Sequence, residues 1–166
     1  KIVNIINFIR GVEPRDPNID LLEPVVNQVK LLKEYGLKGT FLIQYDAMLK
    51  DEFTNLLKKE MCDDIEVGAW FEIVQPLVEK AGLTWRGRDG FAWDPHGHVG
   101  FSVGYTPEER EKLVDIFMED FKLTFGEYPS SVGSWLIDTH SLFYLYNKYG
   151  ILASCNCKDQ WGTDGY

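Results

Sequence analysis

Carboxylates stand at or just beyond the ends of several apolar segments in this chain. Those that could do chemistry are Glu13, Glu72, Asp138, Asp159 and Asp164. Hydrolysis of a glycosidic bond needs two carboxyl groups that flank the bond, about 5 to 5.5 Å apart for retention of configuration or about 6.5 to 9.5 Å for inversion. The alternative is that these groups only face solvent, because surface loops of an acidic protein always carry carboxylates.

Glu72 is the best candidate for a general acid. It follows the apolar segment 65–70 and lies between Phe71 and Ile73. Such dry surroundings raise the pKa of a carboxyl group and favour proton donation near neutral pH. The sequence therefore predicts Glu72 as the acid, with Asp138 or Asp159 as its partner.

A cluster of charges follows the first apolar segment directly. Arg10, Glu13 and Arg15 come after Ile9, at the position where open α/β sheets and α/β barrels bind ligands. We expect Glu13 to pair with Arg10 or Arg15 and to fix the first turn, with Arg10 and Glu13 contacting substrate. The alternative is that these charges merely solvate a turn.

The segment 82–105 is rich in glycine and aromatic residues and has no helical or strand period. Loops of this length are usually functional, and Trp85 and Trp93 could supply flat apolar faces for a sugar ring. Alternatively, these rings tuck back onto the core. The neighbouring His96 and His98 are alternate residues of a glycine-rich loop and do not make a preformed metal site. Further along the chain, His140 could orient a substrate hydroxyl.

The elements that position these residues alternate between strands and helices. Amphipathic helices are expected between the strands, and the strongest helix signal is the capping box that begins at Thr106. This order predicts an α/β fold with a mainly parallel sheet and a first strand buried on both faces. The strands are expected at residues 2–9, 39–44, 65–70, 131–136 and 151–156.

Length and charge limit the fold and the partners that are possible for this chain. The chain has 166 residues, which fits a single domain, and five strand–helix units do not close an eight-fold barrel of typically ~250 residues. We therefore expect the front portion of a distorted or incomplete (β/α) barrel. The net charge of −9 argues against a nucleic-acid partner, and no apolar run is long enough for membrane insertion. The oligomeric state is left open.

The order of short motifs resembles that of the polysaccharide deacetylases, within the glycoside hydrolase/deacetylase superfamily. The matching segments read NFIRG, GLKGTFL, EVGAW, FGEYP and DQW, at residues 7–11, 36–42, 66–70, 125–129 and 159–161. The resemblance implies a distorted (β/α) barrel, a carbohydrate substrate and a location outside the cytoplasm. It also implies sugar contacts from Trp70 and Trp161, which lie in the matched segments.

The metal motifs of that family are degenerate in this chain. The family holds a divalent metal with one aspartate of T-F-D-D-G and two histidines of H-S-x-x-H, where this chain has Ile9 and Arg10, and Trp70 and Val74. None of these four side chains is an ordinary metal ligand. We therefore predict no metal cofactor. Two functions remain open, a carbohydrate-active hydrolase that uses carboxylates and a non-catalytic carbohydrate-binding relative.

Overall fold

The computed structural model of the protein describes residues 3–13, 16 and 18–156. The predicted site residues Asp159, Trp161 and Asp164, and the arginine at position 15, lie outside the described residues. The chain forms one five-stranded sheet in the order β1-β2-β3-β4-β5, and every neighbouring pair of strands is parallel. The strands are β1 (Ile6–Ile9), β2 (Gly39–Gln44), β3 (Ile65–Trp70), β4 (Ser131–Ser134) and β5 (Ala153–Asn156).

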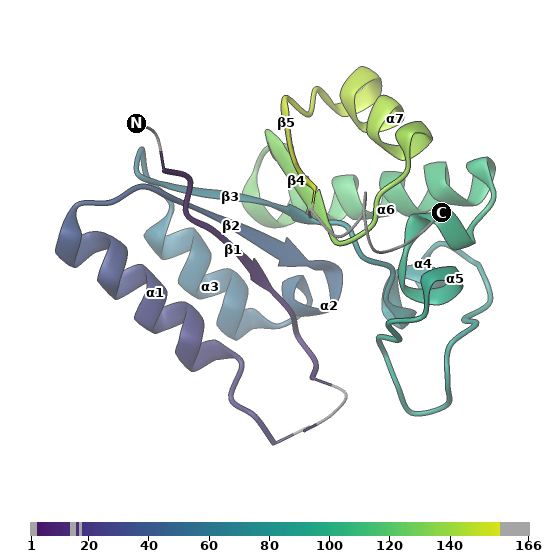
Figure 1. The fold of residues 1–166 in the computed structure, drawn as a ribbon, viewed down its shortest axis with the longest axis horizontal. Coiled ribbons are helices and arrows are strands. Elements are labelled where there is room, and N and C mark those ends of the chain that lie inside the picture. Colours follow the sequence, from purple (N-terminus) through teal and green to yellow (C-terminus); the bar gives the residue numbers. More distant parts are fainter. Residues whose placement is uncertain (1–2, 14–15, 17, 157–166) are drawn as a thin grey trace.

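The sheet is curled into a half-barrel with helices along it (Figure 1), which confirms the predicted incomplete (β/α) barrel. In the register of the sheet, Ile9 lies beside Ile43 and Gln44 lies beside Trp70. The carboxyl ends of β1, β2 and β3 therefore meet at one edge. This edge is the mouth of the half-barrel.

Side-chain hydrogen bonds fix the starts of some of the helices. In the longest helix, Thr106 accepts a hydrogen bond from the Glu109 backbone, and the Glu109 side chain accepts one from the Thr106 backbone. At the first helix, Asp20 accepts from the backbone N–H groups of Leu22 and Glu23. The helices are α1 (Leu22–Tyr35), α2 (Tyr45–Met48), α3 (Asp51–Glu60), α4 (Gln75–Lys80), α5 (Gly97–Gly100), the 3-10 helix η1 (Ser102–Gly104), α6 (Pro107–Phe125) and α7 (Thr139–Tyr149).

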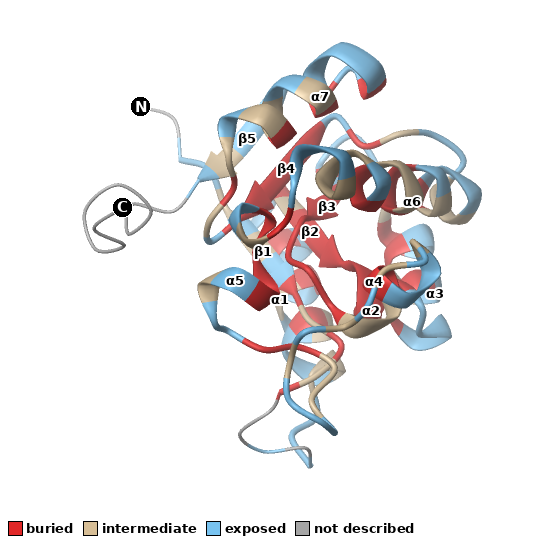
Figure 2. Ribbon diagram, turned by 90° about the vertical axis from the view of Figure 1, so that its right-hand side faces the viewer, coloured by how far each residue is buried: buried red, intermediate tan, exposed pale blue. Residues whose placement is uncertain are grey.

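The main core lies between one face of the sheet and the helices. Figure 2 shows the central strands buried and much of the outward surface of the helices exposed. Because side chains alternate across a strand, one set from each strand packs against the apolar stripes of the helices. Core members include Ile9, Phe41, Ile43, Val67, Ala69 and Val132 from the strands and Val29, Leu32, Phe53, Leu57 and Phe117 from the helices.

The other face of the sheet is concave and aromatic. Trp70 stacks on Phe8 with ring centroids 4.9 Å apart and meets Trp135 edge-on at 6.0 Å. Glycine suits position 133 beneath these rings, because a Cβ there would lie 2.8 Å from the Trp70 ring. The expectation that the first strand is buried on both faces was wrong. Phe8 is 40% exposed, since the helices of the core pack on the opposite face.

The segment 82–105 is more ordered than its sequence suggests, since it contains α5 and η1. It is bonded to the residues that follow β3. The Ile73 N–H donates to the Gly100 carbonyl at 2.8 Å, and Val74 forms an antiparallel bridge with Trp93. The segment therefore lies at the carboxyl end of β3. Among the described residues, no helix has the length and apolar character needed to cross a membrane.

Candidate functional site

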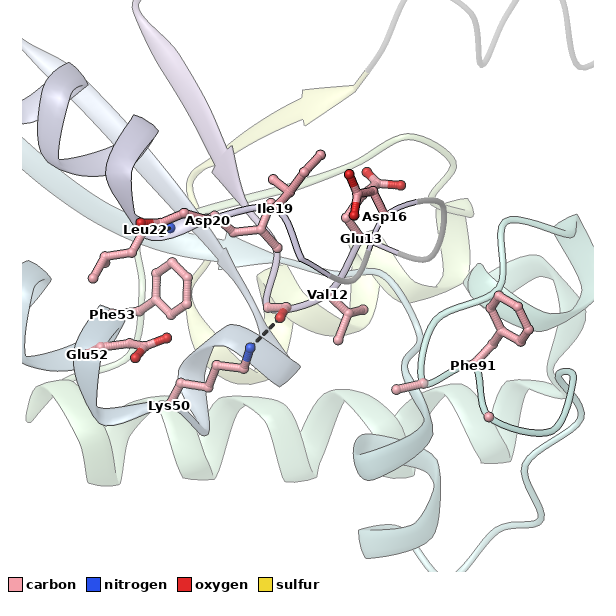
Figure 3. Close-up of a pocket in the computed structure, with 14 residues that line it drawn as sticks. Val12, Glu13, Asp16, Ile19, Asp20, Leu22, Lys50, Glu52, Phe53 and Phe91 are labelled. Atoms are coloured by element: carbon pink, nitrogen blue, oxygen red, sulfur yellow. Dashed lines mark hydrogen bonds between the residues drawn. The ribbon is translucent and has the colours of Figure 1, made fainter.

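A cavity of about 550 Å³ lies at the carboxyl ends of β1 and β2. Figure 3 shows Phe53 and Glu52 on one side of it and Phe91, from the segment 82–105, on the other. Most of the charged side chains that line the cavity are acidic. The exception is Lys50, which donates a hydrogen bond to the Gly11 carbonyl. The lining residues are Gly11, Val12, Glu13, Asp16, Ile19, Asp20, Leu21, Leu22, Lys50, Glu52, Phe53, Gly90, Phe91 and Ala92.

Arg10 links this cavity to the buried part of the mouth. Its guanidinium donates to Glu13 at 3.0 Å, which confirms the predicted pairing of Glu13 with Arg10. The guanidinium carbon also lies 5.2 Å from the centre of the Trp93 ring and 5.8 Å from that of Phe8. Glu13 lines the cavity, so the ion pair connects a cavity residue to Arg10.

Glu72 is buried in this mouth, with 0% of its surface exposed. Burial raises its pKa to about 7, while the nearby Trp70 indole and the Arg10 guanidinium oppose that rise. One carboxyl oxygen accepts a hydrogen bond from the Gln44 amide at 3.0 Å. The dry surroundings predicted for Glu72 are therefore present, and they leave the group able to hold a proton near neutral pH.

Asp46, in α2, is a second buried carboxyl group and was missed by the sequence analysis. It is 6% exposed, and its Oδ1 accepts from the backbone N–H groups of Gly11 at 3.0 Å and of Ala47 at 2.7 Å. Burial raises its pKa, whereas the two backbone donors and the Lys50 and Arg10 cations act in the opposite direction. A signal was available, because Asp46 follows the segment 39–44 at the same distance as Glu72 follows 65–70.

Several buried polar atoms around the mouth lack a hydrogen-bond partner among the described residues. They are Gln44 Oε1, Asp46 Oδ2, Glu72 Oε1, Trp70 Nε1 and Trp93 Nε1. The Trp70 indole is close enough to Glu72 to lower its pKa, yet the two groups are outside hydrogen-bond geometry. Unpaired buried groups are uncommon in native proteins, and this set combines acceptors with donors. Such a set can accommodate a polar ligand or ordered water.

Three of the tryptophans predicted to bind sugar lie among the described residues, and they differ in burial. Trp93 is 8% exposed and belongs to the core, so its ring tucks inward beside Arg10. Trp85 is partly buried and packs against that core beneath Gly87. Trp70 is 1% exposed, and Phe8 covers one of its faces. In this conformation the mouth is therefore lined by buried aromatic rings, and a sugar would need some of them to move.

Two other predicted residues have clear structural contacts. Asp138 caps α7 by accepting from the Ser141 N–H at 2.9 Å, and it pairs with Arg110 at 2.9 Å. Burial raises the pKa of Asp138, but the bonds from Ser102 and Ser141 and the Arg110 charge outweigh burial and lower it overall. His140 contacts Glu111 of α6 at 3.1 Å. These contacts suit an ionised Asp138 better than a proton donor.

A divalent metal, which the family resemblance implies, does not fit the residues at the corresponding positions. Ile9 and Val74 are buried apolar side chains, Arg10 is a cation, and Trp70 offers only an indole. Elsewhere, buried Asp94 binds His96 and Arg88, which already occupy its two oxygens. The described residues contain no group of three or more His, Cys, Asp or Glu side chains arranged to hold a metal ion.

Comparison with known proteins supports the fold. No family profile matches the sequence, and no curated protein matches it. A crystal structure from Parabacteroides distasonis, described as a "putative glycoside hydrolase/deacetylase", is similar with a TM-score of 0.60 and 16% sequence identity. The match covers 93% of this chain and 34% of that one, so this chain spans about a third of the length of its structural neighbour. At this identity the likeness concerns the fold alone.

Proposed function

We propose that this chain is part of a carbohydrate-active hydrolase of the glycoside hydrolase/deacetylase kind, with Glu72 as general acid. The observation that carries the proposal is a fully buried carboxyl group, with its pKa raised to about 7, at the carboxyl ends of parallel strands. Open α/β sheets and barrels bind their substrates at these strand ends. The similar fold of a structure described as a glycoside hydrolase/deacetylase supports the substrate class.

The proposed chemistry follows from the surroundings of Glu72. A general acid is most effective when its pKa lies near the working pH, and Glu72 meets that condition. It would protonate the leaving oxygen of a glycosidic bond, and the Arg10 cation would stabilise the carboxylate that results. An oligosaccharide in the cavity reaches Glu72 when the pair between Arg10 and Glu13 opens. The second carboxylate of the reaction is assigned to Asp138 or Asp159, as the sequence suggests.

The negative charge of the site limits the class of sugar that it can bind. Glu13, Asp16, Asp20 and Glu52 line the cavity, and the whole chain carries a net charge of −9. This field repels uronic acids, sulfates and phosphates and favours neutral or amino sugars. The proposed substrate is therefore an uncharged or cationic poly- or oligosaccharide.

One observation favours a second candidate function, a carbohydrate-binding relative without catalysis. Glu72 is 0% exposed, and the positions of the family's metal ligands hold residues that cannot bind metal. A protein without catalytic activity does not need an open path to Glu72, so aromatic rings can fill the mouth of its half-barrel. Binding of a glycan without any turnover would support this alternative.

A glycan screen followed by a turnover assay tests the proposal. Wild-type protein should bind neutral oligosaccharides and release shorter sugars or a deacylated product, detected by mass spectrometry. The Glu72→Gln variant should bind the same glycan with nearly unchanged affinity but lose turnover at least a hundredfold, because the amide keeps the volume and cannot donate the proton. Equal turnover by the two proteins would disprove the role of Glu72, and binding without turnover by wild type would favour the binding module.

A further inference from the structure

We infer that Asp46 is a positioning residue that keeps the proton of the mouth on Glu72, so that the two carboxyl groups and Arg10 work as one unit. This inference deepens the proposed function and rests on it for its catalytic meaning. The geometry of the unit is a property of the free protein. It can be tested without any substrate.

The two carboxyl groups follow neighbouring strand ends. Gln44 and Trp70 are paired neighbours on β2 and β3, and Asp46 and Glu72 come two residues after them. Both groups are buried, the Asp46 charge raises the pKa of Glu72, and the Arg10 charge lowers the pKa of both, so the three side chains are close enough to interact electrostatically. The Gln44 amide, which donates to Glu72 at 3.0 Å, closes the gap between the two strand ends.

The hydrogen bonds of the two groups are unequal. Asp46 accepts two backbone N–H groups, from Gly11 at 3.0 Å and Ala47 at 2.7 Å, and both favour the ionised form. Glu72 accepts one hydrogen bond within ordinary geometry, from the neutral Gln44 amide, while the Trp70 indole and the Trp135 backbone lie near enough to lower its pKa. Each carboxyl group also has one oxygen, Glu72 Oε1 and Asp46 Oδ2, without a partner among the described residues. When two buried carboxyl groups compete for one proton, the group with fewer donors keeps it. Asp46 is therefore the carboxylate, and Glu72 is the acid.

The surrounding charges act in the same direction. Lys50 contacts the Gly11 carbonyl and stabilises the negative charge of Asp46. Arg10 attracts both carboxylates, but it also donates to Glu13 at 3.0 Å and so is partly neutralised. An ionised Asp46 in turn repels negative charge on Glu72 and contributes to its raised pKa. Glu13 and Asp46 thus share the positive charge of Arg10, and Glu72 stays protonated.

The test is a pH titration of the Glu72 side-chain carbon by NMR in protein labelled with 13C at the glutamate carboxyls. The Glu72 signal is assigned by its absence from the Glu72→Gln spectrum. In Asp46→Asn the Glu72 midpoint should fall by about one pH unit, because a like charge is removed. The asparagine Oδ1 can still accept from Gly11 and Ala47, so the backbone contacts are retained. Asp115→Asn is the matched control. Asp115 lies in α6 and binds Lys148 and Tyr149 of α7, so this change should leave the Glu72 midpoint unchanged.

An unchanged Glu72 midpoint in a folded Asp46→Asn protein would overturn the inference. The wild-type protein gives a second readout that needs no change at position 46. With 13C at the aspartate carboxyls, Asp46 is identified by its proximity to the Gly11 and Ala47 amides. It should already be ionised where Glu72 is half-titrated, and a protonated Asp46 at that pH would overturn the inference equally. Neither readout depends on turnover. The inference about Asp46 can therefore fail while the proposed hydrolase function holds, and the hydrolase function can fail while the inference holds.

Discussion

At the scale of single residues, the mouth gathers Arg10, Glu13, Asp46 and Glu72 at the ends of three strands. Two features of this group could be predicted from the sequence, the burial of Glu72 and the pairing of Arg10 with Glu13. The apolar neighbours of Glu72 indicate burial, and the spacing of Arg10 and Glu13 permits their pair. Asp46 could not be ranked above other acids, because its importance depends on the Gly11 N–H, which is distant in sequence. Its position relative to a strand end was the only local signal.

The buried Glu72 should make stability depend on pH. Its pKa is raised from 4.5 to about 7 on folding. The unfolded chain therefore ionises first, and the free energy of unfolding falls between these two pH values, by roughly 3 kcal/mol in total. Above pH 7 the loss is complete. Glu72→Gln should remove this loss, which urea unfolding at pH 5 and pH 8 would measure.

Glu23→Gln, at an exposed position in the first turn of α1, is the control for this prediction. It should keep the pH dependence of the wild-type protein. If the stability curves of wild type and Glu72→Gln run parallel from pH 5 to pH 8, Glu72 does not hold a raised pKa in the folded chain.

At the scale of elements, β2 and β3 could be predicted best. The segments 39–44 and 65–70 match these two strands, because long apolar runs flanked by polar residues mark them clearly. The other three strands are shorter than predicted: β1 is Ile6–Ile9 within 2–9, β4 is Ser131–Ser134 within 131–136, and β5 is Ala153–Asn156 within 151–156. Ile151, at the start of the predicted fifth strand, packs in the core outside any strand. α5 and η1 could not be predicted, since glycine obscures their short helical pattern.

The segment 82–105 should be held in place mainly by Trp93. Trp93→Ala removes a core ring that lies over Arg10, so the free energy of unfolding should fall by about 3 kcal/mol. Trp85→Ala should cost less, because Trp85 is only partly buried. Chemical denaturation measures both effects.

The same two variants test the role of the segment in binding. A typical domain tolerates a loss of this size and stays folded. Each variant should therefore weaken oligosaccharide affinity, by about tenfold for Trp93→Ala. Unchanged affinity in both variants would show that this segment does not contribute to the binding surface.

At the scale of the whole molecule, the half-barrel carries a mouth built from cations and carboxyl groups, and its described residues include no cluster arranged to hold a metal ion. Its fold could be anticipated from the order of motifs, and the structure confirms that architecture. The closed aromatic concave face could not be anticipated, because it depends on Phe8, Trp70 and Trp135 meeting from three parts of the chain. Such long-range packing leaves no local pattern in the sequence.

Removal of metal should leave the protein unchanged. Ile9, Arg10, Trp70 and Val74 provide no ligand set, so treatment with EDTA should alter neither turnover nor stability. Elemental analysis should find no stoichiometric zinc, even after growth in zinc-rich medium. Stoichiometric zinc at the ends of β1 and β3, or loss of turnover on chelation, would contradict this prediction.

The pH dependence of kcat/KM on a cleaved oligosaccharide tests the central claim most directly. This quantity reports the protonation of groups in the free protein, and Glu72 must be protonated to act as an acid. The rate should therefore fall about tenfold per pH unit above pH 7, the value to which burial raises the pKa of Glu72. In Glu72→Gln the remaining rate should lack this alkaline limb. A wild-type rate that stays constant from pH 6 to pH 9 would contradict the assignment of Glu72 as the general acid.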